Sequence, residues 1–96
     1  KRWEVAKYLT TEWPDRDRYL FPGIEYWKYI FEHPDQAPAE MRSTATWNYF
    51  IGSMFRGADG DWSVPDAVWR GASFARGGDW LSDDWVTGAR VGLLEK

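Results

Sequence analysis

The sequence predicts a mostly α-helical protein: a single small domain over residues 1–96, with four to five short helices joined by Pro/Gly/Asp turns. Proline and glycine divide the chain into helix-sized pieces, and apolar residues recur in most pieces at i, i+3, i+4 spacing. The 44% hydrophobic content indicates a packed core rather than disorder. We expect a helical half, residues 1–56, and a turn-helix half rich in Gly, Asp, Trp and Arg, residues 57–96. An α+β fold with residues 43–51 as a strand is the alternative.

The first two helices are bounded by prolines. Residues 2–12 place apolar side chains at helical spacing, and Pro14 ends the pattern because proline interrupts a helix. A second helix begins at Pro22, a residue favoured in a first turn, and stops before Pro34. Its apolar face consists of Ile24, Trp27, Ile30 and Phe31.

A third helix is predicted to begin at Pro38 and to include the uncharged stretch 43–55. The residues that follow helical spacing in this stretch are Trp47, Phe50, Ile51, Met54 and Phe55. Threonine, tryptophan and tyrosine within residues 44–49 also favour sheets and partly alternate, so a strand over residues 43–51 stays open.

Two further helices are predicted in the last forty residues. Ser63 and Asp66 form a Ser-x-x-Asp start signal with Pro65 in the first turn, and this helix ends at the glycine pair 77–78. Ser82 caps a final helix, whose apolar residues are Val86, Ala89, Leu93 and Leu94.

Charge and composition exclude several classes of protein. Twelve Lys and Arg against fifteen Asp and Glu give a net charge of −3, which argues against a nucleic-acid partner. The longest uncharged stretch, residues 43–55, is too short for a transmembrane span of ~20 residues, while peripheral membrane contact stays open. Without cysteine there is no disulfide and no thiolate metal site. A start at Lys1 rather than Met is compatible with a processed, targeted mature chain, and the compartment stays open.

No cofactor, metal site or catalytic residue is predicted. Acidic turns suit calcium, but a calcium-binding loop counted from Asp59 would need a glutamate where Arg70 stands. The acids that would be candidates for a metal site are Asp59, Asp61, Asp79, Asp83 and Asp84. His33, the one histidine, follows a predicted helix, and no serine lies in a Gly-x-Ser-x-Gly motif. We therefore expect a protein that is not an enzyme.

Tryptophan is the most unusual part of the composition. Eight tryptophans exceed what a 96-residue core can readily enclose, and those hardest to bury lie near a chain end or in turns: Trp3, Trp13, Trp62 and Trp80. The last two stand in a Gly-Asp-Trp sequence that occurs twice, which either duplication or chance explains. Arg70 and Arg76 can stack on such rings, and Gly88 and Gly92 form a small-residue strip that allows close packing on the final helix. These eight residues form the predicted interaction site.

Together these observations predict a non-catalytic accessory or interaction subunit of a larger protein assembly. It would dock on other protein subunits through exposed Trp and Arg side chains, with a position peripheral to a membrane complex left open. The alternative is a ligand-binding module whose tryptophans form platforms for a glycan or a flat hydrophobic cofactor. A small enzyme with carboxylate chemistry is the third hypothesis.

Overall fold

The computed structural model describes residues 1–44, 46–85 and 87–96. In these residues the fold is α+β, with two α-helices and seven strands, so the prediction of a mostly α-helical domain is wrong. The elements follow one another as α1 (Arg2–Thr11), the 3₁₀ turn η1 (Arg16–Arg18), β1 (Tyr19–Leu20), α2 (Ile24–Glu32), η2 (Pro34–Gln36), η3 (Ala39–Met41), β2 (Trp47–Tyr49), β3 (Phe55–Arg56), β4 (Trp62–Trp69), β5 (Phe74–Trp80), β6 (Ala89–Val91) and β7 (Leu94–Glu95).

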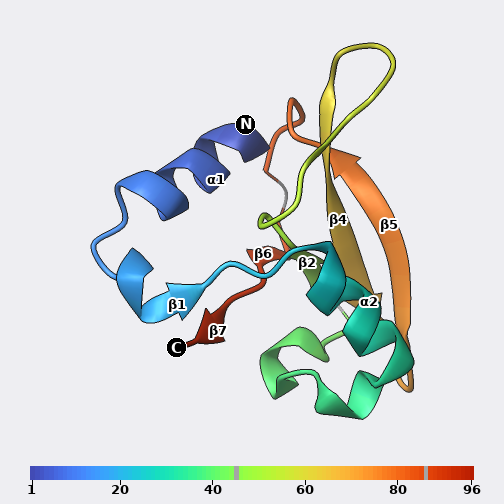
Figure 1. The fold of residues 1–96 in the computed structure, drawn as a ribbon. Coiled ribbons are helices and arrows are strands. Elements are labelled where there is room, and N and C mark those ends of the chain that lie inside the picture. The colour runs from blue at the N-terminus through green and yellow to red at the C-terminus, as the bar shows by residue number, and fades with distance from the viewer. Residues whose placement is uncertain (45, 86) are drawn as a thin grey trace.

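Strand β4 is the centre of a five-stranded sheet (Figure 1). β5 pairs antiparallel with one edge of β4, from Trp69 opposite Phe74 to Ser63 opposite Trp80. The other edge of β4 pairs antiparallel with β2 and then with β3, and β6 adds to β2 in parallel. β1 and β7 form a separate antiparallel pair, which places residues 19–20 beside the C-terminal strand.

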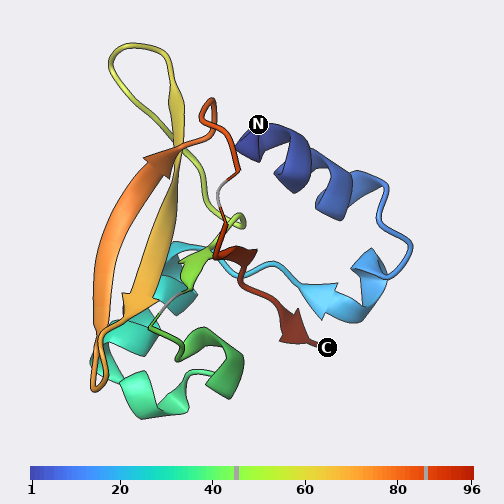
Figure 2. The same cartoon turned by 180° about the vertical axis from the view of Figure 1, so that it is seen from behind.

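Both faces of the sheet carry a hydrophobic core. The α2-side core consists of Ile30, Ala37, Met41, Phe50, Ala67 and Phe74. The α1-side core consists of Ala6, Tyr49, Ile51, Val64 and Leu81. Opposite views show α2 lying across the sheet, while α1 lies to one side of it with its N-terminus near the turn after β5 (Figures 1 and 2). Buried Asn48 links η3 to the sheet, because its Nδ2 donates to the main-chain carbonyls of Met41 at 3.1 Å and Ala67 at 3.0 Å.

Strands occupy the place of the predicted third helix. β2 is paired along both edges, and neighbouring side chains enter different cores: Tyr49 lies in the α1-side core and Phe50 in the α2-side core. Because both faces are covered, apolar residues do not alternate with polar ones, and their spacing resembles that of a helix. The alternative strand over residues 43–51 agrees with β2 at residues 47–49, and residue 45 lies outside the described residues.

The predicted helix over residues 63–78 is instead the hairpin of β4 and β5. Asp66, expected to help start a helix, is a buried residue in the middle of β4. Gly71, with φ +98°, turns the chain between the strands, a conformation that glycine adopts without the steric cost of a side chain. The glycine pair 77–78 lies inside β5 rather than at a helix end, and a Cβ at Gly77 would come within 3.2 Å of the Asp66 carboxylate.

The predicted final helix is also absent from the described residues, which form β6 and β7 there. Gly88 has φ +90° just before β6, and a Cβ at Gly92 would lie 2.8 Å from Cε1 of Phe50. The two glycines therefore serve a turn and an internal contact, and the expected small-residue strip is wrong. Val86, expected on the apolar face of that helix, lies outside the described residues.

The first two predicted helices are present as α1 and α2, with ends that differ by one or two residues. None of the helices in the described part of the chain has the length and apolar character needed to cross a bilayer.

Candidate functional site

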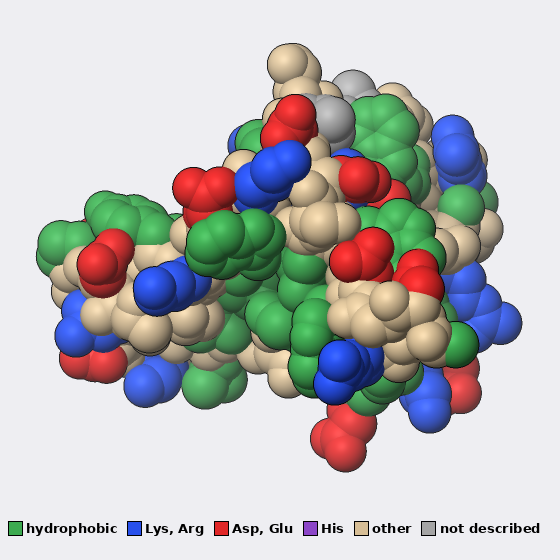
Figure 3. All heavy atoms as spheres, turned by 90° about the horizontal axis from the view of Figure 1, so that it is seen from above, with side chains coloured by type: hydrophobic (Ala, Val, Ile, Leu, Met, Phe, Trp, Pro, Cys, Tyr) green, Lys and Arg blue, Asp and Glu red, His purple; other side chains and the backbone are tan. Residues whose placement is uncertain are grey.

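Three large apolar side chains surround a hollow between the first turn of α1 and the start of β4. Trp3 of α1, Met54 before β3 and Trp62 of β4 are 49%, 39% and 47% exposed. The residues that line this cavity of about 450 Å³, called here the aromatic hollow, are Trp3, Met54, Asp61, Trp62, Leu81 and Ser82. Figure 3, which looks down on the molecule of Figure 1, shows hydrophobic side chains exposed among both acidic and basic ones.

The first turn of α1 holds Trp3 beside the hollow. The first main-chain N–H groups of a helix have no partner within it. Here the N–H of Arg2 donates to the carbonyl of Asp83 at 2.9 Å, and that of Trp3 donates to the carbonyl of Leu81 at 3.1 Å. Nη1 of Arg2 also donates to the carbonyl of Trp80 at 3.0 Å. These bonds fasten the start of α1 to the segment that follows β5.

A cluster of charged side chains around the buried Arg2 lies beside this attachment. Nη1 of Arg2 is 3.3 Å from an Asp83 carboxylate oxygen and 4.0 Å from an Asp79 oxygen, and its guanidinium lies 5.3 Å from the centre of the Tyr49 ring. The pKa of Asp66 is raised to about 7, first by burial and then by its hydrogen bond to Asp79 and the Asp79 charge, whereas the charge of Arg2 lowers it. Burial, and then the charge of Asp79, raise the pKa of Tyr49 to about 12. Asp66 therefore keeps its proton to a much higher pH than an ordinary aspartate does.

The sheet holds Trp62 on the other side of the hollow. Trp62 pairs with Arg56 of β3, and its carbonyl accepts the N–H of Leu81 at 2.8 Å. In the turn before β4, Oδ1 of Asp59 accepts the N–H of Asp61 at 3.1 Å, which is the local hydrogen bond expected of aspartate in turns. Because the main chain is hydrogen-bonded on both sides, the aromatic hollow is a preformed surface.

One acidic side chain that is unpaired among the described residues, Asp61, lines the hollow, and the acids near it at the end of β5 are paired. Asp83 is paired with Arg2, and Asp84 lies 3.6 Å from Nζ of Lys1. Asp61 lines the hollow, and its carboxylate forms no ion pair with any other described residue. As for metal binding, no group of three or more His, Cys, Asp or Glu that could hold an ion occurs in residues 1–44, 46–85 and 87–96.

Two of the eight predicted interaction residues, Trp3 and Trp62, meet in the aromatic hollow. Trp80 is 42% exposed but faces the opposite side of the sheet, because it pairs with Ser63 and neighbouring strand residues point to opposite faces. Trp13 lies in a separate groove described below.

The two predicted arginines are also apart from the hollow. Arg76 lies over the rings of Phe31 and Trp27, at 4.9 and 5.6 Å from the ring centres, and so stacks within the protein. Arg70 is exposed in the turn between β4 and β5.

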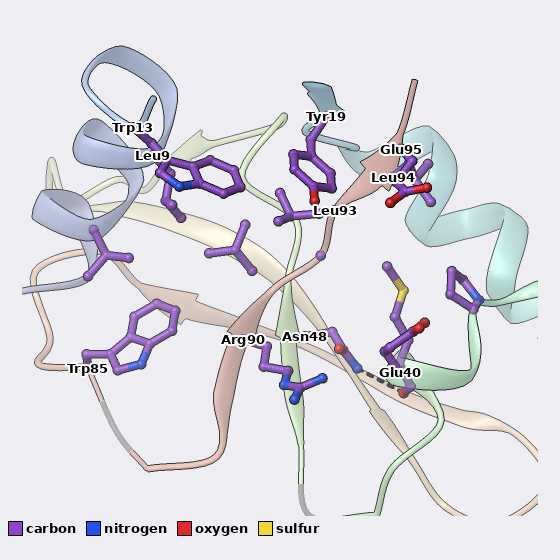
Figure 4. Close-up of a pocket in the computed structure, with 15 residues that line it drawn as sticks. Leu9, Trp13, Tyr19, Glu40, Asn48, Trp85, Arg90, Leu93, Leu94 and Glu95 are labelled. Carbon is purple, nitrogen blue, oxygen red and sulfur yellow. Dashed lines mark hydrogen bonds between the residues drawn. The ribbon is translucent and has the colours of Figure 1, made fainter. Parts of the chain in front are cut away.

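A larger concavity of about 840 Å³, called here the groove, lies between α1 and the C-terminal strands (Figure 4). At its aromatic end Trp13 stacks on Tyr19, with ring centres 5.2 Å apart and 16° between the planes. Trp85 packs edge-on against Tyr49 at 5.5 Å. Leucines and valines form most of the remaining wall, and the polar lining residues are Glu40, Asn48, Arg90 and Glu95.

Arg2, Tyr49 and Asp66 are not among the residues predicted from the sequence, and neither is the groove. A single acid between two apolar pairs, Val64-Pro65 and Ala67-Val68, is a signal that could have identified Asp66 as buried. Nothing near Arg2 in the sequence marks it, since its side-chain partners lie 78 and 81 residues away.

The chain matches no protein-family model, and neither a curated protein nor a solved structure matches it. The aromatic hollow and the groove are therefore the features on which a functional proposal rests.

Proposed function

We propose that this protein is a non-catalytic interaction protein that docks onto another protein through the aromatic hollow. The observation that carries the proposal is that Trp3 and Trp62, each about half exposed, border one cavity. Contiguous exposed apolar surface is a mark of contact sites on soluble proteins. Tryptophan is also among the residue types that dominate the energetics of protein interfaces.

Burial of the two rings would contribute a substantial part of a binding free energy. A tryptophan side chain presents on the order of 200 Å², so the exposed halves of Trp3 and Trp62 together amount to roughly 200 Å². At ~25 cal/mol per Å², their transfer from water contributes about 5 kcal/mol before the entropic cost of association. Truncation of either ring should then weaken binding by about 2 kcal/mol.

The attachment of both rings to hydrogen-bonded main chain favours binding. Trp3 follows the anchored Arg2, and Trp62 lies at the start of the central strand β4. A surface that is ordered before binding loses less conformational entropy when a partner arrives.

The charges around the hollow favour a partner segment that is both apolar and basic. Asp61 lies in the lining without an ion pair to another described residue, and the whole chain carries a net charge of −3. Opposite charges at the edge of an interface speed association and exclude like-charged competitors. We therefore expect an apolar side chain of the partner in the hollow, with Lys or Arg beside it.

The position of Asp66 supports a non-catalytic function. A general acid or base must reach the substrate. Although its pKa is raised to about 7, Asp66 is only 7% exposed and lines neither the hollow nor the groove. Its neighbours Arg2 and Asp79 belong to the cluster that holds α1 on the sheet.

Selection from a random peptide library on the immobilised protein tests the docking proposal. The dissociation constants of selected peptides are then measured by calorimetry for the wild type, Trp62→Ala and Trp47→Ala. Trp47 is 41% exposed and lies outside the hollow, so it provides a matched control. We expect peptides that combine apolar and basic residues, with affinity reduced at least about tenfold by Trp62→Ala and unchanged by Trp47→Ala. Absence of enrichment, or equal affinity for Trp62→Ala, would contradict the proposal.

A further inference from the structure

We propose that the groove binds an organic ammonium compound that carries a flat apolar ring. This site goes beyond the docking function, since no residue lines both the groove and the aromatic hollow. Its volume of about 840 Å³ lies within the range of roughly 300–1,000 Å³ that is typical of small-molecule sites.

The aromatic end of the groove suits the flat ring of such a ligand. Trp13 is only half-buried on top of Tyr19, and Trp85 lies on another wall of the same space (Figure 4). Aromatic faces carry negative electrostatic potential, so they attract the electropositive edges of other rings and also cations. Leu9 and Leu93 add apolar surface between these rings.

The charges in the groove favour a cation over an anion. Glu40 of η3 and Glu95 of β7 are exposed, and neither forms an ion pair within the described part of the chain. Arg90 is the one basic residue in the described lining, so two carboxylates against one guanidinium leave a net charge of −1. Figure 4 shows both glutamates on the side away from Trp85, so a ligand with its ring at the aromatic end would direct its ammonium group toward them.

Three probes that share one ring system test this inference: 2-naphthylmethylamine, neutral 2-naphthylmethanol and anionic 2-naphthoate. Their dissociation constants are measured by calorimetry at neutral pH and low salt. Exposed ion pairs are individually weak, so we expect the amine to bind about three- to tenfold more tightly than the alcohol, and the naphthoate to bind most weakly. The proposal would be overturned if the alcohol or the naphthoate bound as tightly as the amine or more tightly. It would also be overturned if the amine did not bind at a concentration of about 1 mM.

A double variant, Glu40→Gln with Glu95→Gln, locates the charge preference. Both side chains are exposed, so the fold should persist, which thermal unfolding verifies. The affinity of the amine should fall to that of the alcohol, whose own affinity should not change. If the double variant keeps the preference for the amine, the proposal fails.

The Trp62→Ala variant separates this inference from the docking proposal. It should bind 2-naphthylmethylamine as tightly as the wild type, because Trp62 lies outside the groove. Loss of amine binding in Trp62→Ala would assign the probe to the aromatic hollow and overturn the groove site alone. Conversely, normal amine binding with no peptide binding would overturn only the docking function.

Discussion

Replacement of Asp66 by asparagine perturbs the charged cluster around Arg2 that holds α1 on the sheet. In the folded protein Asp66 is 7% exposed, and burial followed by the influence of Asp79 raises its pKa from 3.8 to about 7. In the unfolded chain the pKa returns to its ordinary value, so folding takes up a proton between these two pH values. The corresponding stability is fully present below pH 3.8 and is lost as the pH rises through about 7.

The size of this effect follows from the same shift in pKa. A rise from 3.8 to about 7 spans about three pH units, and each unit corresponds to about 1.4 kcal/mol. The free energy of unfolding should therefore fall by up to about 4 kcal/mol between pH 4 and 7 because of Asp66. Asparagine has nearly the same shape and does not titrate, so Asp66→Asn should lose none of this free energy.

Urea unfolding from about pH 4 to about pH 8 measures the effect for the wild type and Asp66→Asn. The free energy of unfolding of Asp66→Asn minus that of the wild type should increase by several kcal/mol as the pH rises toward 7, and should then stay constant. Asp17→Asn, at an exposed site, serves as the control and should leave the pH profile of the wild type unchanged. A difference that stays constant, or that grows in favour of the wild type, would refute the reasoning.

Four further substitutions, of which Gly78→Ala is a control, test the packing by denaturant unfolding. A Cβ at Gly52 would overlap the carbonyl oxygen of Phe21, so Gly52→Ala should lower the free energy of unfolding by about 2–3 kcal/mol. A Cβ at Gly78 would have its nearest neighbour, the Val64 carbonyl oxygen, at 3.7 Å, so Gly78→Ala should change this free energy little. Equal costs for the two alanines would contradict this close approach. Asn48→Ala removes the side-chain donor of two buried carbonyls and should lower the free energy of unfolding by about 2–3 kcal/mol. An unchanged free energy of unfolding would show that these hydrogen bonds do not stabilise the fold. Arg2→Ala removes a buried side chain, its hydrogen bond to the Trp80 carbonyl and its ion pairs with the partly exposed Asp79 and Asp83. The free energy of unfolding should fall by about 2–3 kcal/mol, with loss of α1 helicity by circular dichroism. Unchanged helicity would mean that Arg2 does not anchor the helix.

The two α-helices could be predicted because local sequence determines them. Pro14 follows α1, and Pro34 follows α2. The apolar face of α2 packs on one side of the sheet, and Ala6 of α1 lies in the core on the other side. The strands were harder to predict, because Tyr49 and Phe50 enter opposite cores and so remove the alternation that identifies a strand. Ser63 and Asp66 resemble a helix cap, yet pairing with distant strands overrides this local preference.

Part of the candidate site could also be predicted from composition. A surplus of tryptophan identifies rings that the core cannot enclose, and Trp3 and Trp62 are indeed exposed. The two rings lie at one hollow because Arg2 donates hydrogen bonds to Trp80 and Asp83, which are 78 and 81 residues away in the sequence. No spacing rule connects such distant residues, so the hollow and the groove emerge only from the fold.

The central claim is that Trp3 and Trp62 form one docking surface, and the indole N–H resonances of the tryptophans test it most directly. A peptide selected on the wild-type protein is titrated into ¹⁵N-labelled protein. The signals of Trp3 and Trp62 should shift together with one dissociation constant, while that of Trp27, whose indole N–H already donates to the Asp66 carbonyl, should not move. Peptide binding that shifts only Trp13 and Trp85, or neither ring of the hollow, would contradict the claim.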